Sequence, residues 1–487
     1  MLNQGKQSKC RINRIIRIWS TERKGSNALK NVVVIMSDQH SAHAVGCYGN
    51  PEVHTPVLDH LAHHGVRFEH AYTTSPVCVP ARFSALSGLY PSRTGCVNNA
   101  TPLPIDVRTA AHYFREAGYL TAFIGKMHPV DAQTHGFDYY IDFGHYYDYL
   151  GRKLEAFTKG MQADDSGKGV PWIDIYQRPE HHWSMAPLRD ARSQNLPEEE
   201  HFESFIVREA MRFFQAYARH RPVFLFVSFL RPHTPLVVPE RFSSGYDWKA
   251  LPLPHTYQDP AHNVNPYLQS RMVEGLHTQA GQELAKQHLA RYYAAVTFID
   301  DKVGELVDGL ERCPSEDPPI ICYTSDHGDM LFEHGMLSKF TFYEASVTVP
   351  WILAGPGIPQ HRVVASPIDH TFLLPSLLDF AGVPVAQFDG VSVRPWVEGD
   401  PDGVPVFSEF FVAQDKFMHM VRQGEWKFVR HPDGWNQLFN LQADPAESQN
   451  LAGCHHPEEL RLSTLLTSHI ESMQITHPNL RGPNPRV

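Results

Sequence analysis

The sequence lacks the cysteine spacing of a disulfide-stapled or zinc-binding protein. Small disulfide frameworks and structural zinc sites both need closely spaced cysteines, often as CxxC pairs. This chain of 487 residues has an odd number of widely scattered cysteines, which are Cys10, Cys47, Cys78, Cys96, Cys313, Cys322 and Cys454. Neither a disulfide framework nor a zinc site built from cysteines is therefore indicated, and each cysteine has to be considered alone.

Long apolar runs and an excess of positive charge are missing as well. No run of eighteen apolar residues occurs, which excludes a membrane-spanning helix. The formal net charge is −10 and no basic face is visible, which argues against nucleic acid as a partner. Because this charge disfavours nucleic acid, the substrate is expected to be small or sugar-like. We find no internal repeats along the chain.

The first thirty residues are rich in lysine and arginine but lack the core of a signal peptide. Their apolar stretch RIIRIWS is far too short for a secretory h-region. We therefore expect residues 1–30 to form a basic, disordered arm and the protein to be cytoplasmic. A surface-binding element is one alternative. A mis-assigned start, which would allow a periplasmic location, is another.

The remaining chain has the pattern of an α/β protein. It is 42% hydrophobic and long enough to bury a large core. Short β-branched and aromatic runs alternate with helical patterns, which is typical of a mostly parallel sheet covered on both faces. We expect surface helices within residues 55–68, 107–118, 200–220 and 292–311.

Changes in pattern along the chain predict its domains. We expect a catalytic domain over residues 31–400. Short alternating stretches then indicate a small antiparallel subdomain over residues 401–487. The segment 130–197 is rich in aromatic residues and histidine and has no clear period. We therefore expect it to be an insertion over the site that sets substrate preference.

Four of the buried apolar runs end in polar residues. Ligands of open α/β sheets bind just beyond the carboxyl ends of the strands, so these residues are expected to converge. They are Asp38 and Gln39 after the first run, Lys126 and His128 after the second, His233 after the third, and Asp326 and His327 after the fourth.

These residue types suit a hard cation beside an anion site. A divalent ion such as Ca²⁺, Mg²⁺ or Mn²⁺ fits the oxygen and imidazole donors of Asp38, Gln39, Asp326 and His327. Positive charge and hydrogen-bond donors for a tetrahedral oxyanion would come from Lys126, His128, His233 and Lys339. Each residue taken alone has a simpler interpretation, as a helix cap, a loop histidine bonded to backbone or a solvated lysine.

The stretch SPVCVPARFSALSGLYPSRTG, residues 75–95, places a thiol where a helix is predicted to begin. Serine, aspartate or asparagine normally stands there. Pro80 suits a first helical turn, and the positive helix end favours a nearby anion. Arg82 follows Cys78 by four residues and can share its face. The pattern C-x-P-x-R resembles the signature of the formylglycine-dependent, type I sulfatase family, part of the alkaline-phosphatase-like superfamily.

The resemblance covers nearly the whole chain, from Asn31 to Ala452. The stretches VVVIMSDQH, GKMH, PHTP, TSDHGDMLFEHGMLSK and QLFNLQADPAESQNLAG also follow the family's order. The resemblance implies an α/β, alkaline-phosphatase-like fold, with a mixed, mostly parallel sheet flanked by helices and a smaller C-terminal antiparallel subdomain. It also implies a sulfuric ester hydrolase that releases inorganic sulfate and an alcohol.

The resemblance further implies a role for each candidate residue. In the family, C-x-P-x-R directs oxidation of the cysteine to formylglycine, whose hydrated form is the nucleophile, so a formylglycine-generating enzyme is an implied partner. Carried over by position, Arg82 would hold the diol, His128 would be the base and His233 the acid. Sulfate oxygens would be neutralised by Lys126 and Lys339. The metal would be bound by Asp38, Gln39, Asp326, His327 and the modified Cys78.

Gln39 and His327 depart from the commonest family pattern, which has a second aspartate and an asparagine there. The choice of metal therefore stays open, with Ca²⁺ as the first expectation and Mg²⁺ or Mn²⁺ as alternatives. An Asp–Gln start also occurs in choline sulfatase-like proteins and in phosphonate monoester hydrolases. The expected substrate is a small-molecule or carbohydrate sulfate ester. Phosphonate or phosphate ester hydrolysis, or a silent protein with unmodified Cys78, are the alternatives, and a homo-oligomer is compatible with the sequence.

Overall fold

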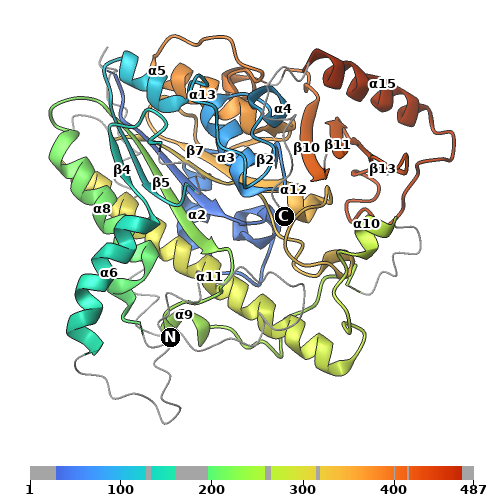
Figure 1. The fold of residues 1–487 in the computed structure, drawn as a ribbon, viewed down its shortest axis with the longest axis horizontal. Helices are drawn as coiled ribbons and strands as arrows, with labels where there is room; N and C mark the ends of the chain where they lie inside the picture. The colour runs from blue at the N-terminus through green and yellow to red at the C-terminus, as the bar shows by residue number, and fades with distance from the viewer. Residues whose placement is uncertain are drawn as a thin grey trace.

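A computed structural model describes residues 29–127, 133–158, 196–257, 265–313, 318–399, 401–413 and 416–473. A large central sheet has helices on both faces, and a second, smaller sheet lies beside it and carries its own helix (Figure 1). The fold class predicted from the sequence, a mixed and mostly parallel sheet with an antiparallel C-terminal part, is confirmed.

Nine strands form the main sheet within the described ranges. Their order is β4-β3-β5-β1-β6-β7-β2-β8, and β9 pairs with β2. Their bounds are β1 Val32–Asp38, β2 Val66–Tyr72, β3 Leu120–Gly125, β4 Tyr139–Ile141, β5 Val223–Pro232, β6 Ile320–Ser325, β7 Thr348–Ala354, β8 Arg362–Val364 and β9 Ile368–Asp369. The strand β7 runs antiparallel to β6 and β2, whereas the other pairs are parallel.

Strand β1 shows why the sheet is covered on both faces. All seven of its residues are buried, and successive side chains point to opposite faces. Val34 and Met36 pack into one apolar cluster, and Val33 and Ile35 pack into another. A strand that is apolar at every position can only be satisfied between two layers of helices.

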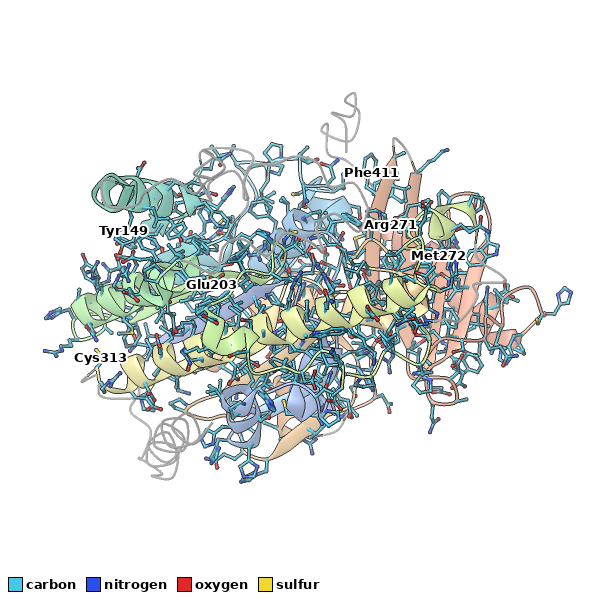
Figure 2. All side chains as sticks on the ribbon, turned by 90° about the horizontal axis from the view of Figure 1, so that it is seen from below. Tyr149, Glu203, Arg271, Met272, Cys313 and Phe411 are labelled. Carbon is cyan, nitrogen blue, oxygen red and sulfur yellow. The ribbon has the colours of Figure 1, made fainter. Side chains whose placement is uncertain are left out.

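The two helical layers come from different parts of the chain. One face of the sheet packs against α3 Cys78–Ser87, α5 Ala110–Glu116 and α13 Leu373–Ala381. The other packs against α2 Pro56–His63, α6 Phe143–Thr158, α8 Phe202–Tyr217 and α11 Gln279–Glu311. Figure 2 shows α11 crossing the length of the molecule, with Cys313 just beyond one end. The shorter helices are α4 Pro91–Thr94, α9 Glu240–Ser243, α10 Pro266–Gln269, α12 Glu344–Val347 and α14 Arg394–Glu398.

The second sheet is an antiparallel meander covered by one helix. It consists of β10 Val406–Ala413, β11 Lys416–Gln423, β12 Trp426–Arg430 and β13 Asn436–Asn440, and the helix is α15 Pro457–Ser472. Leu462 and Leu466 of α15 pack against Phe428 of β12 in one apolar cluster. The prediction of short alternating strands followed by a helix is therefore correct, while the boundary at residue 400 stays a prediction.

A buried charge cluster joins the two sheets. Tyr72 of β2 donates to Glu344 Oε2 at 2.6 Å, and Lys427 Nζ of β12 donates to Glu344 Oε1 at 2.7 Å. Lys427 also pairs with Glu447, and Arg422 of β11 donates to the Tyr72 hydroxyl. Because these residues come from both sheets, the cluster fixes one sheet against the other.

The predicted helix over residues 55–68 is wrong at its C-terminal end. Helix α2 stops at His63, and β2 begins at Val66. Gly65 marks the change, because a Cβ there would lie 2.3 Å from the carbonyl oxygen of Leu353 on β7. The close approach of two strands therefore overrides the helical pattern of the sequence. Helix α11 starts earlier than the predicted residue 292. It begins at Gln279, and Thr278 Oγ1 caps this end by accepting a hydrogen bond from the N–H of Gly281.

Several predicted segments are described only in part. Of the segment 130–197, residues 139–141 form β4 and residues 143–158 form α6, and residues 130–132 and 159–195 lie outside the described residues. Residues 1–28 of the predicted arm also lie outside them, while Lys30 Nζ donates to the carbonyl of Pro356 at 3.1 Å. None of the helices in the described part of the chain is long and apolar enough to cross a membrane.

Candidate active site

Four neighbouring strands end at one edge of the main sheet, and polar residues stand at their ends. In spatial order β3, β5, β1 and β6, these residues are Lys126, His233, Asp38 and Asp326. Lys126, Asp38 and Asp326 are buried, and the side chain of His233 is 17% exposed. The convergence that the sequence predicts at the carboxyl edge is thus what the structure shows.

Helix α3 points its first residue into this edge. It begins at Cys78, and the preceding Val77 offers no side-chain cap. Cys78 Sγ lies 2.9 Å from Lys339 Nζ, 3.3 Å from His327 Nε2 and 4.0 Å from Asp38 Oδ1. Burial and the Asp38 carboxylate raise the pKa of the thiol, but the ammonium groups of Lys339 and Lys126 outweigh them and hold it well below its ordinary value. The site therefore favours an anionic group at this position.

Arg82 ties the carboxylates together from the next turn of α3. Its Nη2 donates to Asp38 Oδ2 at 2.8 Å, and its Nε donates to Asp326 Oδ2 at 2.9 Å. Its Nη1 donates to the carbonyl of Lys126 at 2.7 Å and to Ser228 Oγ at 2.6 Å. Arg82 thus joins residues that lie in or directly after four neighbouring strands, and its predicted contact with a diol stays a prediction.

Gln39 adopts a conformation that few side chains tolerate. Its φ is 64°, in the left-handed region, and its backbone N–H donates to Asp326 Oδ1 at 2.9 Å. Its carbonyl accepts from the Tyr292 hydroxyl at 2.5 Å, and its side-chain Nε2 donates to Asp329 Oδ2 at 2.5 Å. Its Oε1 is buried and accepts no hydrogen bond. The amide oxygen is therefore left available for a positively charged group.

His327 is oriented in a similar way. Its Nδ1 donates to the carbonyl of Gly328 at 3.0 Å, which leaves Nε2 unprotonated beside Cys78 and Lys339. Its backbone N–H donates to Asp326 Oδ1 at 2.9 Å. Gly328 is required here, because a Cβ would lie 2.0 Å from the carbonyl oxygen of Ala345. A metal-binding histidine commonly has its other ring nitrogen held in this way.

The donor set fits a hard divalent cation. One ligand atom each from Asp38, Cys78, Asp326 and His327 lies within 4.8 Å of the others, and all four residues are buried. The unsatisfied Oε1 of Gln39 adds a neutral oxygen donor. Carboxylate, amide and imidazole donors without a second sulfur match Ca²⁺, Mg²⁺ or Mn²⁺ better than a soft metal.

The two lysines, Lys126 and Lys339, supply the positive charge of the site, and His233 lies beside them. Lys126 Nζ lies 2.5 Å from Asp38 Oδ2, and His233 Nε2 lies 3.8 Å from Asp38 Oδ1. His233 Nδ1 donates to the carbonyl of Thr234 at 2.7 Å. Burial, followed by the charges of Lys339 and Lys126, holds the pKa of His233 well below its ordinary value. An anion that screens these two charges would let His233 accept a proton more readily.

The sequence prediction and the described site differ at three residues. His128, the predicted base, lies outside the described residues. Asp329 and Ser228 were not predicted, although Asp329 holds the Gln39 side chain and Ser228 bonds Arg82. The only sequence signal for Asp329 is its place three residues after Asp326, which by itself also suits a loop residue bonded to backbone.

Comparison with known proteins agrees with this geometry. Residues 30–383 match the Sulfatase family, and residues 332–475 match the family described as N-sulphoglucosamine sulphohydrolase, C-terminal. A choline-sulfatase of Rhizobium meliloti is 34% identical over 87% of this chain and 82% of its own length. An arylsulfatase of Clostridium perfringens is 28% identical over 88% of this chain and 91% of its own length.

Solved structures show the same fold. A phosphonate monoester hydrolase from Silicibacter pomeroyi superposes with a TM-score of 0.77 at 24% identity, over 92% of this chain and 96% of that chain. The phosphonate monoester hydrolase of Agrobacterium radiobacter gives a TM-score of 0.76 at 22% identity, over 94% and 100%. The family match and the relatives together show that this chain belongs to the sulfatase family and is a sulfuric ester hydrolase.

Proposed function

We propose that this chain hydrolyses sulfate esters with a formylglycine made from Cys78 and a divalent cation bound beside it. The observation that carries this proposal is the position of Cys78. Its Sγ lies at the start of α3, buried between Lys339 and His327 and close to Asp38. A buried thiol with several charged neighbours and no disulfide partner suits a reactive group better than a packing residue.

The Cys78 sulfur occupies the place that the aldehyde oxygen of formylglycine, or a hydroxyl oxygen of its hydrate, would take on the same Cβ. Hydrated to a diol, the aldehyde supplies an oxygen nucleophile for the ester sulfur and a second hydroxyl whose deprotonation expels sulfate and restores the aldehyde. An ordinary serine offers no such second hydroxyl. The side chain of residue 78 already points at the carboxylates, so the modified group would occupy the same place.

The cation would be held by Asp38, Gln39, Asp326 and His327 together with the modified Cys78. Such an ion lowers the pKa of a bound oxygen and polarises it. Arg82 neutralises part of the carboxylate charge and keeps both carboxylates oriented by its bonds at 2.8 and 2.9 Å. Ca²⁺ is the ion that we expect first, because oxygen donors predominate.

The positive side of the site would bind the sulfate group. Lys339 and Lys126 are both buried, and each lies against an anionic partner, Cys78 Sγ or Asp38 Oδ2. Charge-assisted hydrogen bonds from buried lysines to sulfate oxygens would position the ester. His233 Nε2 would hold the proton for the departing alcohol oxygen, and His128 would take the proton of the second hydroxyl.

The relatives suggest which esters to assay. The choline-sulfatase of Rhizobium meliloti is 34% identical to this chain, so we propose a sulfate ester of a small alcohol as the substrate, with choline sulfate as the first compound to test. The superposition on two phosphonate monoester hydrolases keeps phosphonate esters as the second candidate.

Mass spectrometry of the peptide that contains Cys78 tests the nucleophile directly. Conversion of the thiol to an aldehyde lowers the mass by about 18 Da. We expect the modified protein to hydrolyse a chromogenic aryl sulfate, and the Cys78→Ala variant to have no turnover while its melting temperature stays within a few degrees. Ester cleavage by protein whose Cys78 is fully unmodified would contradict the mechanism.

A substrate panel then separates the ester classes. The same preparation is assayed with choline sulfate, carbohydrate sulfates, aryl sulfates and phosphonate esters at equal concentration. Higher kcat/KM for the sulfate esters supports the proposal. A kcat/KM for phosphonate esters well above every sulfate ester would move the chain to the second candidate.

A further inference from the structure

Four histidines gather far from the carboxyl edge of the sheet, with His60 buried and the other three at least partly exposed. His60 and His63 lie in the last turn of α2, His64 follows it, and His361 precedes β8. Their ring centroids are 4.0 Å apart for His60 and His64, 4.2 Å for His63 and His361, and 4.9 Å for His63 and His64. Because β2 and β8 begin beside this cluster and run parallel to each other, it lies at their amino-terminal ends. It is therefore separate from the active site.

The backbone holds the two contributing segments in register. The N–H of His361 donates to the carbonyl of His63 at 3.2 Å, and the N–H of Arg362 donates to the carbonyl of Gly65 at 3.2 Å. The pairing of β8 with β2 continues from there. The imidazole rings are thus brought together by the fold and not by contacts of their own.

Two of the four imidazoles have a lowered pKa, which favours the neutral form that a metal ion requires. Burial, followed by the neighbouring His64 and His63, lowers the pKa of His60 to about 4. Partial loss of hydration, followed by the charges of His361 and His64, lowers the pKa of His63 as well. A neutral imidazole keeps the lone pair that binds a metal ion, so the lowered pKa of His60 and His63 reduces competition by protons at these two rings.

Two ring nitrogens support a ligand role. His64 Nδ1 donates to the carbonyl of His60 at 3.0 Å, which leaves Nε2 as the nitrogen with a free lone pair. Histidines that bind metals are commonly fixed in this way through their second nitrogen. His60 Nε2 is buried and has no hydrogen-bond partner, which is unusual for a buried polar atom.

We propose that His63, His64 and His361, with His60 adjacent, form a second metal site that binds a borderline transition-metal ion such as Zn²⁺. Imidazole nitrogen suits Zn²⁺, Ni²⁺ and Cu²⁺, whereas Ca²⁺ and Mg²⁺ prefer oxygen. The two sites of the chain therefore differ in the class of metal that they select.

Binding requires the rings to rotate. Among the described residues, three or more ligand atoms lie within 4.8 Å of one another only in the active-site group and in the group of Glu198, Asp301 and Glu305. The nitrogens of the histidine cluster therefore have to converge. His63 and His361 are exposed, so their rings can turn about the side-chain bonds without disturbing the core.

Zinc titration of the untagged protein tests the proposal. The protein is first saturated with Ca²⁺ so that the active site is filled, and Zn²⁺ binding is then measured by calorimetry. We expect one Zn²⁺ per chain at the histidine cluster. Loss of an outer-shell partner alone lowers metal affinity by about 10- to 100-fold. Loss of a ligand in His63→Ala or His361→Asn should lower it at least as much.

A matched histidine provides the control. His455 is exposed and has a φ of 57°, the same as His361, so His455→Asn makes the same chemical change in the same backbone conformation away from the cluster. It should leave Zn²⁺ affinity unchanged. The variant Asp326→Asn should keep the zinc site while it weakens Ca²⁺ binding. Equal Zn²⁺ affinity in the parent chain, His63→Ala and His361→Asn, or an equal loss in His455→Asn, would overturn the proposal.

Discussion

Replacing Asp329 by asparagine should weaken cation binding at the active site without touching a ligand. Asp329 Oδ2 accepts from Gln39 Nε2 at 2.5 Å, while its Oδ1 accepts from the N–H groups of Leu331 and Ser338, both at 2.9 Å. The variant keeps the two backbone bonds but turns an NH₂ group towards the Gln39 amide. Two donors then face each other, so we expect the Gln39 amide to flip and present its NH₂ group to the cation.

Two separate considerations give the size of the effect. A hydrogen bond to a charged group contributes about 1.5–3 kcal/mol. Loss of an outer-shell partner lowers metal affinity by about 10- to 100-fold, which is about 1.4–2.8 kcal/mol. The two ranges agree, so the Kd for Ca²⁺ measured by calorimetry on metal-free Asp329→Asn should rise by roughly one to two orders of magnitude.

A second substitution should restore binding. In the double variant Gln39→Glu with Asp329→Asn, residue 39 carries a carboxylate. One of its oxygens can accept a hydrogen bond from the introduced amide at residue 329, and the other can bind the cation. Asp300→Asn is the matched control, because buried Asp300 accepts from Val57 N and Leu58 N at 3.0 and 2.8 Å, away from the site. It should lower the melting temperature and leave the Ca²⁺ affinity unchanged. An unchanged Ca²⁺ affinity in Asp329→Asn, or no recovery in the double variant, would refute this role of Asp329.

Three further outcomes are expected. The variant His233→Ala should lose about 10²- to 10⁴-fold in kcat on alkyl sulfates, with a loss that shrinks as the leaving alcohol becomes more acidic; an equal loss across a series of aryl sulfates would argue against an acid role. The variant Lys427→Met should lower the free energy of unfolding at pH 7 by about 3–5 kcal/mol in urea titrations, since it leaves Glu344 and Glu447 buried without their main cation. Burial raises the pKa of Glu344, but Lys427 and Arg422 lower it to about 2, so its stabilising contribution is present above its unfolded pKa of 4.5 and is lost as pH falls towards 2. The stability difference between parent and Lys427→Met should therefore narrow over that interval, and a difference that widens would contradict the role of the cluster.

The parts of the fold that the sequence predicts are those with strong local signals. The runs that became β1, β3, β5 and β6 are apolar at nearly every position, and each ends in a polar residue at the same edge. Strand β2 gave no such signal, because its sequence VRFEHAY mixes apolar and charged residues and it follows α2 after only His64 and Gly65. Its structure is set by β7, a neighbour that is distant in the sequence.

The residues of the site also divide into those with a local signal in the sequence and those placed by distant parts of the chain. Cys78, Arg82 and the residues that end strands could be found because each lies in a short motif whose chemistry can be stated. The contacts of Gln39 with Asp329 and Tyr292 join residues separated by 290 and 253 positions, so no local pattern encodes them. The histidine cluster likewise depends on the parallel pairing of β8 with β2, which brings His361 to the end of α2.

The burial of Cys78 has a consequence for the order of events during synthesis. Its side chain is only 1% exposed, with Lys339 supplied by a segment 261 positions later in the chain. A maturation enzyme cannot bind the peptide around Cys78 once this side chain is buried in the folded protein. On our proposal, oxidation of the thiol must precede completion of the fold, during or soon after emergence from the ribosome. Chains that fold before oxidation would remain stable but permanently inactive. The specific activity of a preparation would therefore depend on the rate of Cys78 oxidation relative to the rate of folding.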